Sequence, residues 1–167
     1  MAKSERKLLA HYIDAAFDST YEATDYQIIG ADLTEFSVTL NPQVETKENI
    51  LGANTVVHSG YNPASSVSPF SHDPKKTLEA KVMELAMARK KGDQCKTSYV
   101  EVLYQEAENG SYEIVHCFRE DVLCIPTSYG GDVNGVQSPF DIHYAGNRTA
   151  GSFDKSTKKF TASDAAL

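Results

Sequence analysis

Alternation of apolar and polar residues, interrupted at intervals by turn residues, constrains the fold of this chain more than any other feature. The alternation is clear in residues 36–40, 100–104, 112–118 and 140–144. Side chains of a β-strand point alternately to the two faces of a sheet, so a period of two is typical of a strand with one buried and one wet face. Asn109-Gly110, between two of these runs, is a strong hairpin signal. With weaker patterns included, we expect about seven or eight strands in a β-sandwich or barrel.

The first two expected strands are separated by a long polar excursion. A strand over residues 35–40 should end at Asn41-Pro42, because proline cannot donate a hydrogen bond to a sheet ladder. Residues 55–58 form the return strand, which leaves residues 41–54 as an extended loop at the tip of the hairpin. Residues 60–74, which contain three prolines, predict a second extended loop.

The later part of the chain continues the β pattern. Residues 122–125 are an apolar run closed by Pro126, which predicts a fully buried segment. Residues 130–135 contain three glycines and predict a wide turn. A weaker pattern over residues 152–161 would complete the sheet.

A single helix is expected over residues 74–91. Asp73 would cap its N-terminus, Pro74 would occupy the first helical position, and Gly92 would end it in a left-handed conformation. One face of this helix carries an apolar stripe formed by Leu78, Val82 and Leu85. We expect the stripe to cover the outside of the sheet, with partner binding as the alternative. The fold class is therefore mainly β with one flanking α-helix.

The charge balance excludes several classes of protein. The formal net charge is −7 and the sequence pI is about 5.2, whereas a protein that grips nucleic acid through its phosphates needs a cationic face. No apolar run approaches the length of about 18 residues that a membrane-spanning helix needs. Residues 3–10 resemble the start of a signal peptide, but His11 and Asp14 interrupt the apolar stretch. The three cysteines have no metal-binding spacing, so we expect buried, reduced thiols.

No catalytic motif is present in the sequence. Gly130-Gly131 lacks the Gly-Lys-Ser/Thr of a phosphate-binding loop. Asp141 and His143 lie two residues apart on one strand face and are the best metal candidates, although a polar cross-strand pair explains them equally well. We therefore expect no enzyme activity, no catalytic residue, no metal and no cofactor.

Several segments resemble, in order, the major tail tube proteins of long-tailed bacteriophages and prophages of Gram-positive bacteria. The similarity extends over roughly residues 6 to 155. The segments that carry it are Leu40 to Gly52, Gly60 to Pro63, Gly92 to Thr97, Val122 to Asp132, and Pro139 to Arg148.

This resemblance implies a structural virion protein with a single tail-tube domain over residues 1–167. In that family a β-sandwich flanked by a helix assembles into rings of six copies, and the rings stack into a tube that conducts the genome to the host. The implied partners are other copies of the chain and the tape-measure, tail-terminator and baseplate or initiator proteins. Double-stranded DNA would pass through without specific binding, and no membrane is involved. The implied location is the virion tail, assembled in the bacterial cytoplasm.

The resemblance also implies roles for particular residues. Candidates for contacts between subunits, in the two extended loops, are Asn41, Glu45, Ile50, Leu51, Tyr61 and Phe70. For Tyr61, packing within its own loop is an equal alternative. Candidates for an acidic lumen are Glu101, Glu106, Glu108 and Glu113, which are equally compatible with ordinary solvated surface. Six copies at −7 each would give a ring a formal charge of about −42, which repels a polyanion.

A second class of function stays open. A non-enzymatic β-sandwich that binds carbohydrate or a cell surface could use the 9 tyrosines and 7 phenylalanines of the chain. The chain has no tryptophan, the aromatic residue most expected at a sugar site.

Overall fold

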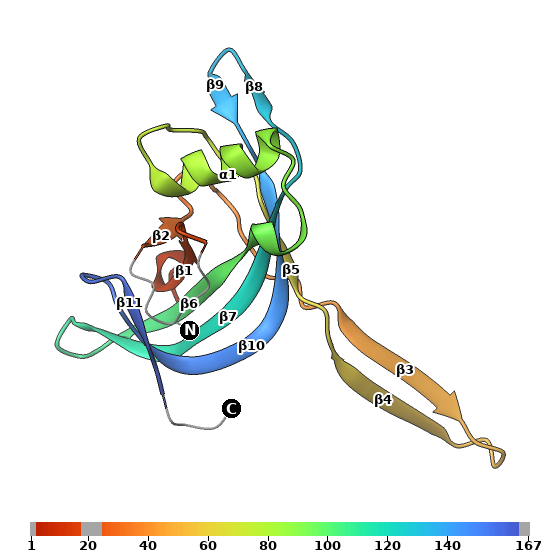
Figure 1. Cartoon of the computed structure of the whole chain (residues 1–167). Helices are drawn as coiled ribbons and strands as arrows, with labels where there is room; N and C mark the ends of the chain where they lie inside the picture. Colours follow the sequence, from red (N-terminus) through yellow and green to blue (C-terminus); the bar gives the residue numbers. More distant parts are fainter. Residues whose placement is uncertain (1–2, 18–24, 164–167) are drawn as a thin grey trace.

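A curled antiparallel sheet of seven strands is the central element of the fold in a computed structural model, which describes residues 3–17 and 25–163 (Figure 1). The strands run in the order β11-β10-β7-β6-β1-β2, and β5 pairs with β10 on the edge that β11 also occupies. Their bounds are β1 Leu9–Asp14, β2 Tyr26–Ile29, β5 Ala64–Val67, β6 Lys96–Glu106, β7 Tyr112–Pro126, β10 Phe140–Asp154 and β11 Lys159–Ala162. Together with one helix, they make the fold mainly β, as the alternation predicts.

One core lies inside the curl of the sheet. The ring of Phe153, near the end of β10, lies with its centroid 4.4 Å from that of Tyr12 on β1 and 5.8 Å from that of Tyr26 on β2. Val100 and Val102, alternate residues of β6, are fully buried in the same cluster. The expected weak strands over residues 152–161 are confirmed as the hairpin of β10 and β11.

A second core lies on the opposite face of the sheet, beneath α1 (Thr77–Met87). The helical stripe is confirmed, because Leu78, Val82 and Leu85 are all fully buried. The expected bounds of residues 74–91 are too wide. Asp73 accepts backbone hydrogen bonds from the next residues and forms a turn before the helix. The helix ends at Met87, with Ala88 as its C-cap, and Arg89 follows in a left-handed conformation. Gly92 has the predicted positive φ, +64°, but it begins the short 3-10 helix η2 (Gly92–Cys95) and does not end α1.

The predicted strand over residues 35–40 is wrong. Phe36 is buried in the core beneath α1, and only Thr39 forms a bridge, to Ala64. The hairpin consists instead of β3 (Pro42–Glu48) and β4 (Asn54–Tyr61), so it includes most of the predicted 41–54 excursion. Residues 42–48 show no alternation of apolar and polar side chains, because the side chains on both faces of β3 are exposed. Ladder hydrogen bonds hold this hairpin together, and the Ser59 hydroxyl adds a bond to the carbonyl of Gln43 across the two strands at 3.3 Å.

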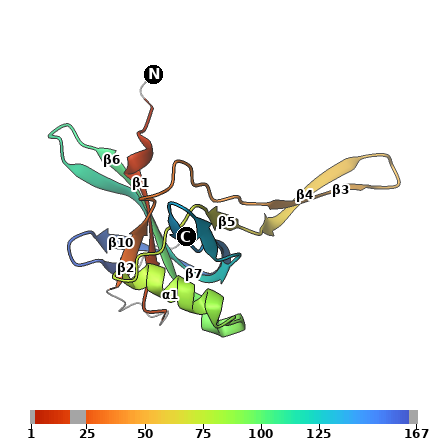
Figure 2. The ribbon, with the colours of Figure 1, turned by 90° about the horizontal axis from the view of Figure 1, so that it is seen from above.

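Hairpin β3–β4 projects from one side of the body as a long arm, and the views in Figures 1 and 2 agree on this. A second, shorter hairpin joins β8 (Gly130–Asp132) and β9 (Gly135–Gln137), where a wide turn was expected. The expected loop over residues 60–74 also contains β5, whose Val67 is fully buried against the sheet. The loop prediction is therefore wrong for those four residues.

The hairpin signalled by Asn109-Gly110 is confirmed, with β6 and β7 paired along most of their length. The expected buried run at residues 122–125 is the second half of β7 and is buried only at alternate positions, since Val122 and Cys124 are buried while Ile125 is 41% exposed. Strands β1 and β2 had no sequence signal. Within the described part of the chain, no helix has the length and apolar character needed to cross a membrane.

Candidate assembly surface

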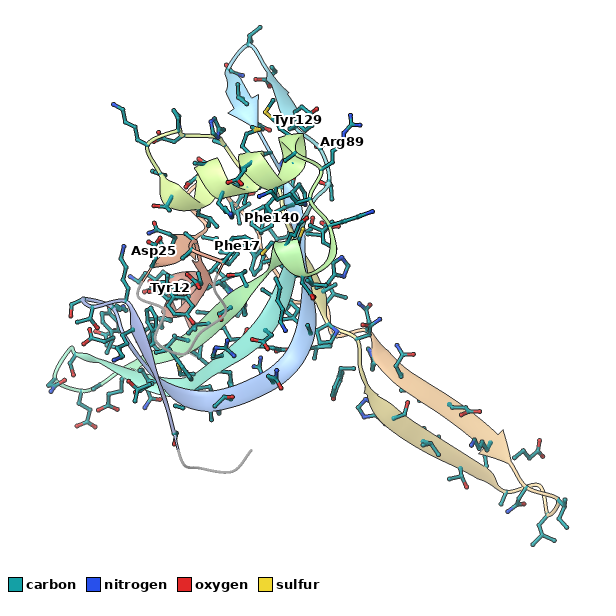
Figure 3. The ribbon with its side chains drawn as sticks, viewed as in Figure 1. Tyr12, Phe17, Asp25, Arg89, Tyr129 and Phe140 are labelled. Carbon is teal, nitrogen blue, oxygen red and sulfur yellow. The ribbon has the colours of Figure 1, made fainter. Side chains whose placement is uncertain are left out.

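The arm formed by β3 and β4 exposes apolar side chains along its length and at its tip. Ile50 is 102% exposed and Leu51 86% exposed, while Val44 and Val56 on the strands are 57% and 66% exposed. Figure 3 shows the side chains of the arm standing in open space, away from the body. An exposed two-stranded ribbon with an apolar tip is a feature that another protein surface is suited to cover.

The tip of the arm is held in shape by Asn49. Its side-chain oxygen accepts hydrogen bonds from the backbone N–H groups of Leu51 and Ala53, at 2.9 and 3.0 Å. Its backbone N–H also donates to the carbonyl of Ala53 at 3.0 Å. Gly52 has a φ of +77°, which glycine adopts without strain. The turn therefore presents Ile50 and Leu51 outward on a fixed backbone.

The base of the arm is organised by Asn41, one of the predicted contact residues. Its side-chain amide donates to the carbonyl of Asn62 at 3.0 Å, and Asn62 N–H donates to the carbonyl of Leu40 at 3.0 Å. Gln43 donates to the carbonyl of Asn41 at 3.0 Å. The structure gives Asn41 a role inside its own chain, where it fixes the direction in which the arm leaves the body.

Of the two aromatic anchors proposed for assembly, one is exposed and one is not. Tyr61 is 57% exposed at the base of the arm and packs edge-on against His58, with ring centroids 4.7 Å apart. Phe70 is only 8% exposed and packs edge-on against Phe140 at 5.0 Å. The structure corrects the expectation for Phe70, because its ring belongs to the core. Glu45 lies on the exposed arm, 3.8 Å from Lys47.

The four predicted lumen acids are in two different settings. Glu101 is partly buried and forms an ion pair with Arg148, which also donates to Glu120 at 2.9 Å and lies 4.3 Å above the ring of Phe118. This pairing offsets the charge of Glu101. The other three are exposed on or beside the β6–β7 turn: Glu106, Glu108 and Glu113.

A buried polar chain on β1 and β6 had no sequence signal. His11 is 4% exposed, and Arg6 approaches its Nε2 atom at 3.0 Å. A guanidinium only donates, so Nε2 accepts and Nδ1 carries the proton toward the hydroxyl of Tyr99, which donates to Glu101 at 3.3 Å. Burial, and secondly the charge of Arg6, lowers the pKa of His11 to about 4. His11 is therefore neutral at physiological pH.

The metal candidates are not brought into a ligand cluster. Asp141 accepts a hydrogen bond from Ser66 at 2.8 Å across the β5–β10 pair, while His143 is exposed. Among the described residues, no group of three or more His, Cys, Asp or Glu side chains could hold a metal ion. Burial raises the pKa of the Cys117 thiol to about 12 and that of Cys124 further, so both stay protonated at neutral pH.

Comparisons with known proteins found solved structures of low sequence identity. No family model matches the chain, and no curated protein matches it. A solved structure of the Hcp1 protein from the E. coli EAEC 042 pathovar is 8% identical, with a TM-score of 0.41 over 93% of this chain and 96% of that one. A crystal structure of an Hcp protein is also 8% identical, with a TM-score of 0.38 over 93% of this chain and 98% of that one. Similarity at this level carries no weight for the function.

Proposed function

We propose that the chain is a structural subunit that assembles with copies of itself into a tube. The observation that carries this proposal is the arm β3–β4, which holds Ile50 and Leu51 on an ordered turn and leaves both exposed. Burying an aliphatic side chain of this size contributes about 1.5–3 kcal/mol. One such contact is weak. In a polymer, each copy contacts one neighbour through its own arm and a second neighbour through the arm of that neighbour, so the contributions add up.

The sheet edges support the same proposal. Strand β2 pairs only with β1 in the described chain, and Ile28 on this edge strand is 62% exposed. Edge strands with free backbone groups pair readily with another strand, and a closed ring of copies removes such edges. We propose that six copies join through these edges into a ring and that the arms connect successive rings.

The biological role follows from the resemblance to major tail tube proteins. In this proposal the tube belongs to a phage or prophage tail, is assembled in the bacterial cytoplasm with tape-measure, terminator and initiator proteins, and conducts DNA during ejection. In this proposal the β6–β7 turn faces the lumen, where the exposed acids beside it give the tube a wall that repels DNA.

Negative-stain microscopy of the purified protein and of particles from producing cells tests the proposal. The wild-type chain should form rings or tubes of uniform diameter. A double variant, Ile50→Ser with Leu51→Ser, should remain a folded monomer, whereas Val133→Ser, at a 101% exposed apolar site on the β8–β9 turn, should assemble normally. A chain that stays monomeric at high concentration, is absent from particles and binds a glycan would overturn the proposal.

A further inference from the structure

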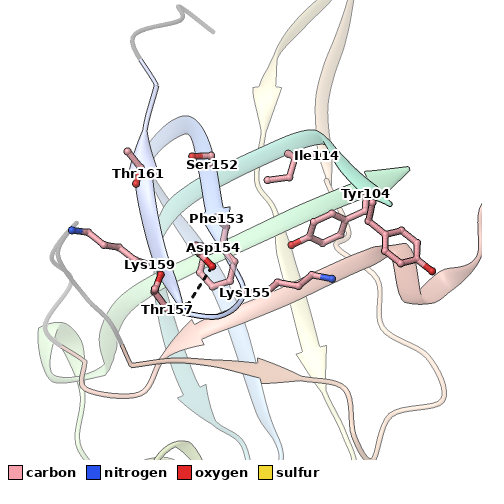
Figure 4. A pocket seen from close by; sticks show the side chains of 10 residues that line it. Tyr104, Ile114, Ser152, Phe153, Asp154, Lys155, Thr157, Lys159 and Thr161 are labelled. Carbon is pink, nitrogen blue, oxygen red and sulfur yellow. Dashed lines mark hydrogen bonds between the residues drawn. The ribbon is translucent and has the colours of Figure 1, made fainter. Parts of the chain in front are cut away.

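A groove of about 750 Å³ opens between the inner face of the β6–β7 hairpin and the β10–β11 turn (Figure 4). Tyr104, Tyr112 and Ile114 form an apolar floor on adjacent strands. Lys155, from the β10–β11 turn, reaches across this floor. Its ammonium lies 4.1 Å from the centroid of the Tyr104 ring and 5.8 Å from that of Tyr112.

Two polar groups in this groove form neither an ion pair nor a hydrogen bond in the described chain. No carboxylate lies within ion-pair distance of Lys155 among the described residues, and the neighbouring Asp154 carboxylate accepts hydrogen bonds from its own turn at Ser156. The hydroxyl of Tyr104 is buried and has no hydrogen-bond partner among the described residues. Burial raises the pKa of Tyr104 to about 12, so the hydroxyl stays protonated and the aromatic floor carries no negative charge. The groove therefore suits a carboxylate next to an apolar group.

The tip of the arm offers that combination. Ile50 and Leu51 are its exposed apolar side chains, and Glu48 precedes them at the end of β3. Glu48 is exposed and has no ion pair in the described chain, in contrast to Glu45, which lies 3.8 Å from Lys47.

Resting on the proposed function, we infer that the groove receives the arm tip of another copy. Glu48 of one copy pairs with Lys155 of the next, while Ile50 and Leu51 cover the aromatic floor. The arm and the groove lie on opposite sides of the body in both ribbon views, so a chain cannot fill its own groove (Figures 1 and 2). A contact between two different surfaces can close into a ring, or it can form an open polymer with one arm and one groove free at its ends.

Charge reversal with rescue tests the pairing. Lys155→Glu alone and Glu48→Lys alone should each weaken self-association at least tenfold in sedimentation velocity, and the double variant should recover most of the loss. Lys158→Glu makes the same charge change in the same turn outside the groove and should have little effect. Melting temperatures should stay near wild type, because all three side chains are exposed.

Cysteine cross-linking tests the contact itself. A chain with Leu51→Cys mixed with a chain carrying Ile114→Cys should form a mixed disulfide in assembled protein. The same chain mixed with Val133→Cys should not, because that residue lies at the tip of the β8–β9 turn, outside the groove. If wild-type tubes form but neither rescue nor selective cross-linking occurs, the groove is not the receptor and the proposed function stands. If the wild-type chain assembles neither in solution nor in particles, both are overturned.

Discussion

Replacing His11 should remove a large part of the acid sensitivity of this fold. The imidazole is 4% exposed and takes part in a directed hydrogen-bond chain from Arg6 through His11 to Tyr99. A proton on Nε2 would turn the acceptor of the Arg6 bond into a second donor facing a cation. The His11→Gln variant keeps a donor and an acceptor at this position but does not titrate.

The size and sign of the effect follow from the shifted pKa. The unfolded chain binds a proton at His11 near pH 6.5, whereas the folded chain does so only near pH 4. Between these values the unfolded state binds more protons, so acidification favours unfolding. From pH 7.5 to pH 4.5 the wild type should lose about 2–3 kcal/mol through this residue alone. The His11→Gln variant should lose none of this stability, because glutamine does not titrate.

Urea unfolding of wild type and His11→Gln at both pH values measures the difference. The remaining groups contribute equally to the pH dependence of both proteins, so only the difference between the two pH dependences is attributed to His11. The variant should be less stable at pH 7.5 and should lose clearly less stability on acidification. Equal losses for the two proteins would refute the assigned tautomer and the depressed pKa.

Three further predictions concern packing and assembly. Gly151→Ala should lower the free energy of unfolding by about 1–3 kcal/mol, because a Cβ there would overlap the carbonyl oxygen of Thr161; a wild-type urea midpoint would contradict this. Phe140→Ala should cost about 3–5 kcal/mol, since the ring is fully buried, and calorimetry would reveal a smaller loss if the site collapses. Tyr61→Ala should change the melting temperature little but reduce assembly in negative stain; loss of the folded monomer would instead place Tyr61 in the core.

The sequence predicts this fold best where one face of a strand is buried. In β10, the alternation over residues 140–144 matches burial in the structure, because Phe140 and Ile142 are fully buried while Asp141 and His143 are not. The apolar stripe of the helix is also predicted correctly, because one face of the helix is buried. The helix bounds are less well predicted, since Asp73 satisfies a turn as readily as a helix cap.

Prediction fails where burial does not follow the expected period. Strand β1 includes His11 and Asp14, which interrupt the apolar pattern, yet both are buried. His11 has Tyr99 on the neighbouring strand β6 as a partner, and the Asp14 carboxylate accepts a hydrogen bond from the backbone N–H of Ala16 at 3.0 Å. The arm shows the opposite case, since residues 42–48 bury neither face. The contact candidates at its tip are exposed, whereas Phe70 looks like a loop aromatic in the sequence and is buried against Phe140.

The sequence by itself determined the strand-rich class, the Asn109-Gly110 hairpin, the apolar face of the helix and the acidic balance, because each depends on residues close together in the chain. Tertiary structure decided the rest. The curl that brings Phe153 onto Tyr12 joins positions far apart in sequence. The same holds for the groove that brings Lys155 over Tyr104. The local sequence pattern does not show which residues distant in the chain come into contact. Those contacts determine which surfaces stay exposed for another copy to cover.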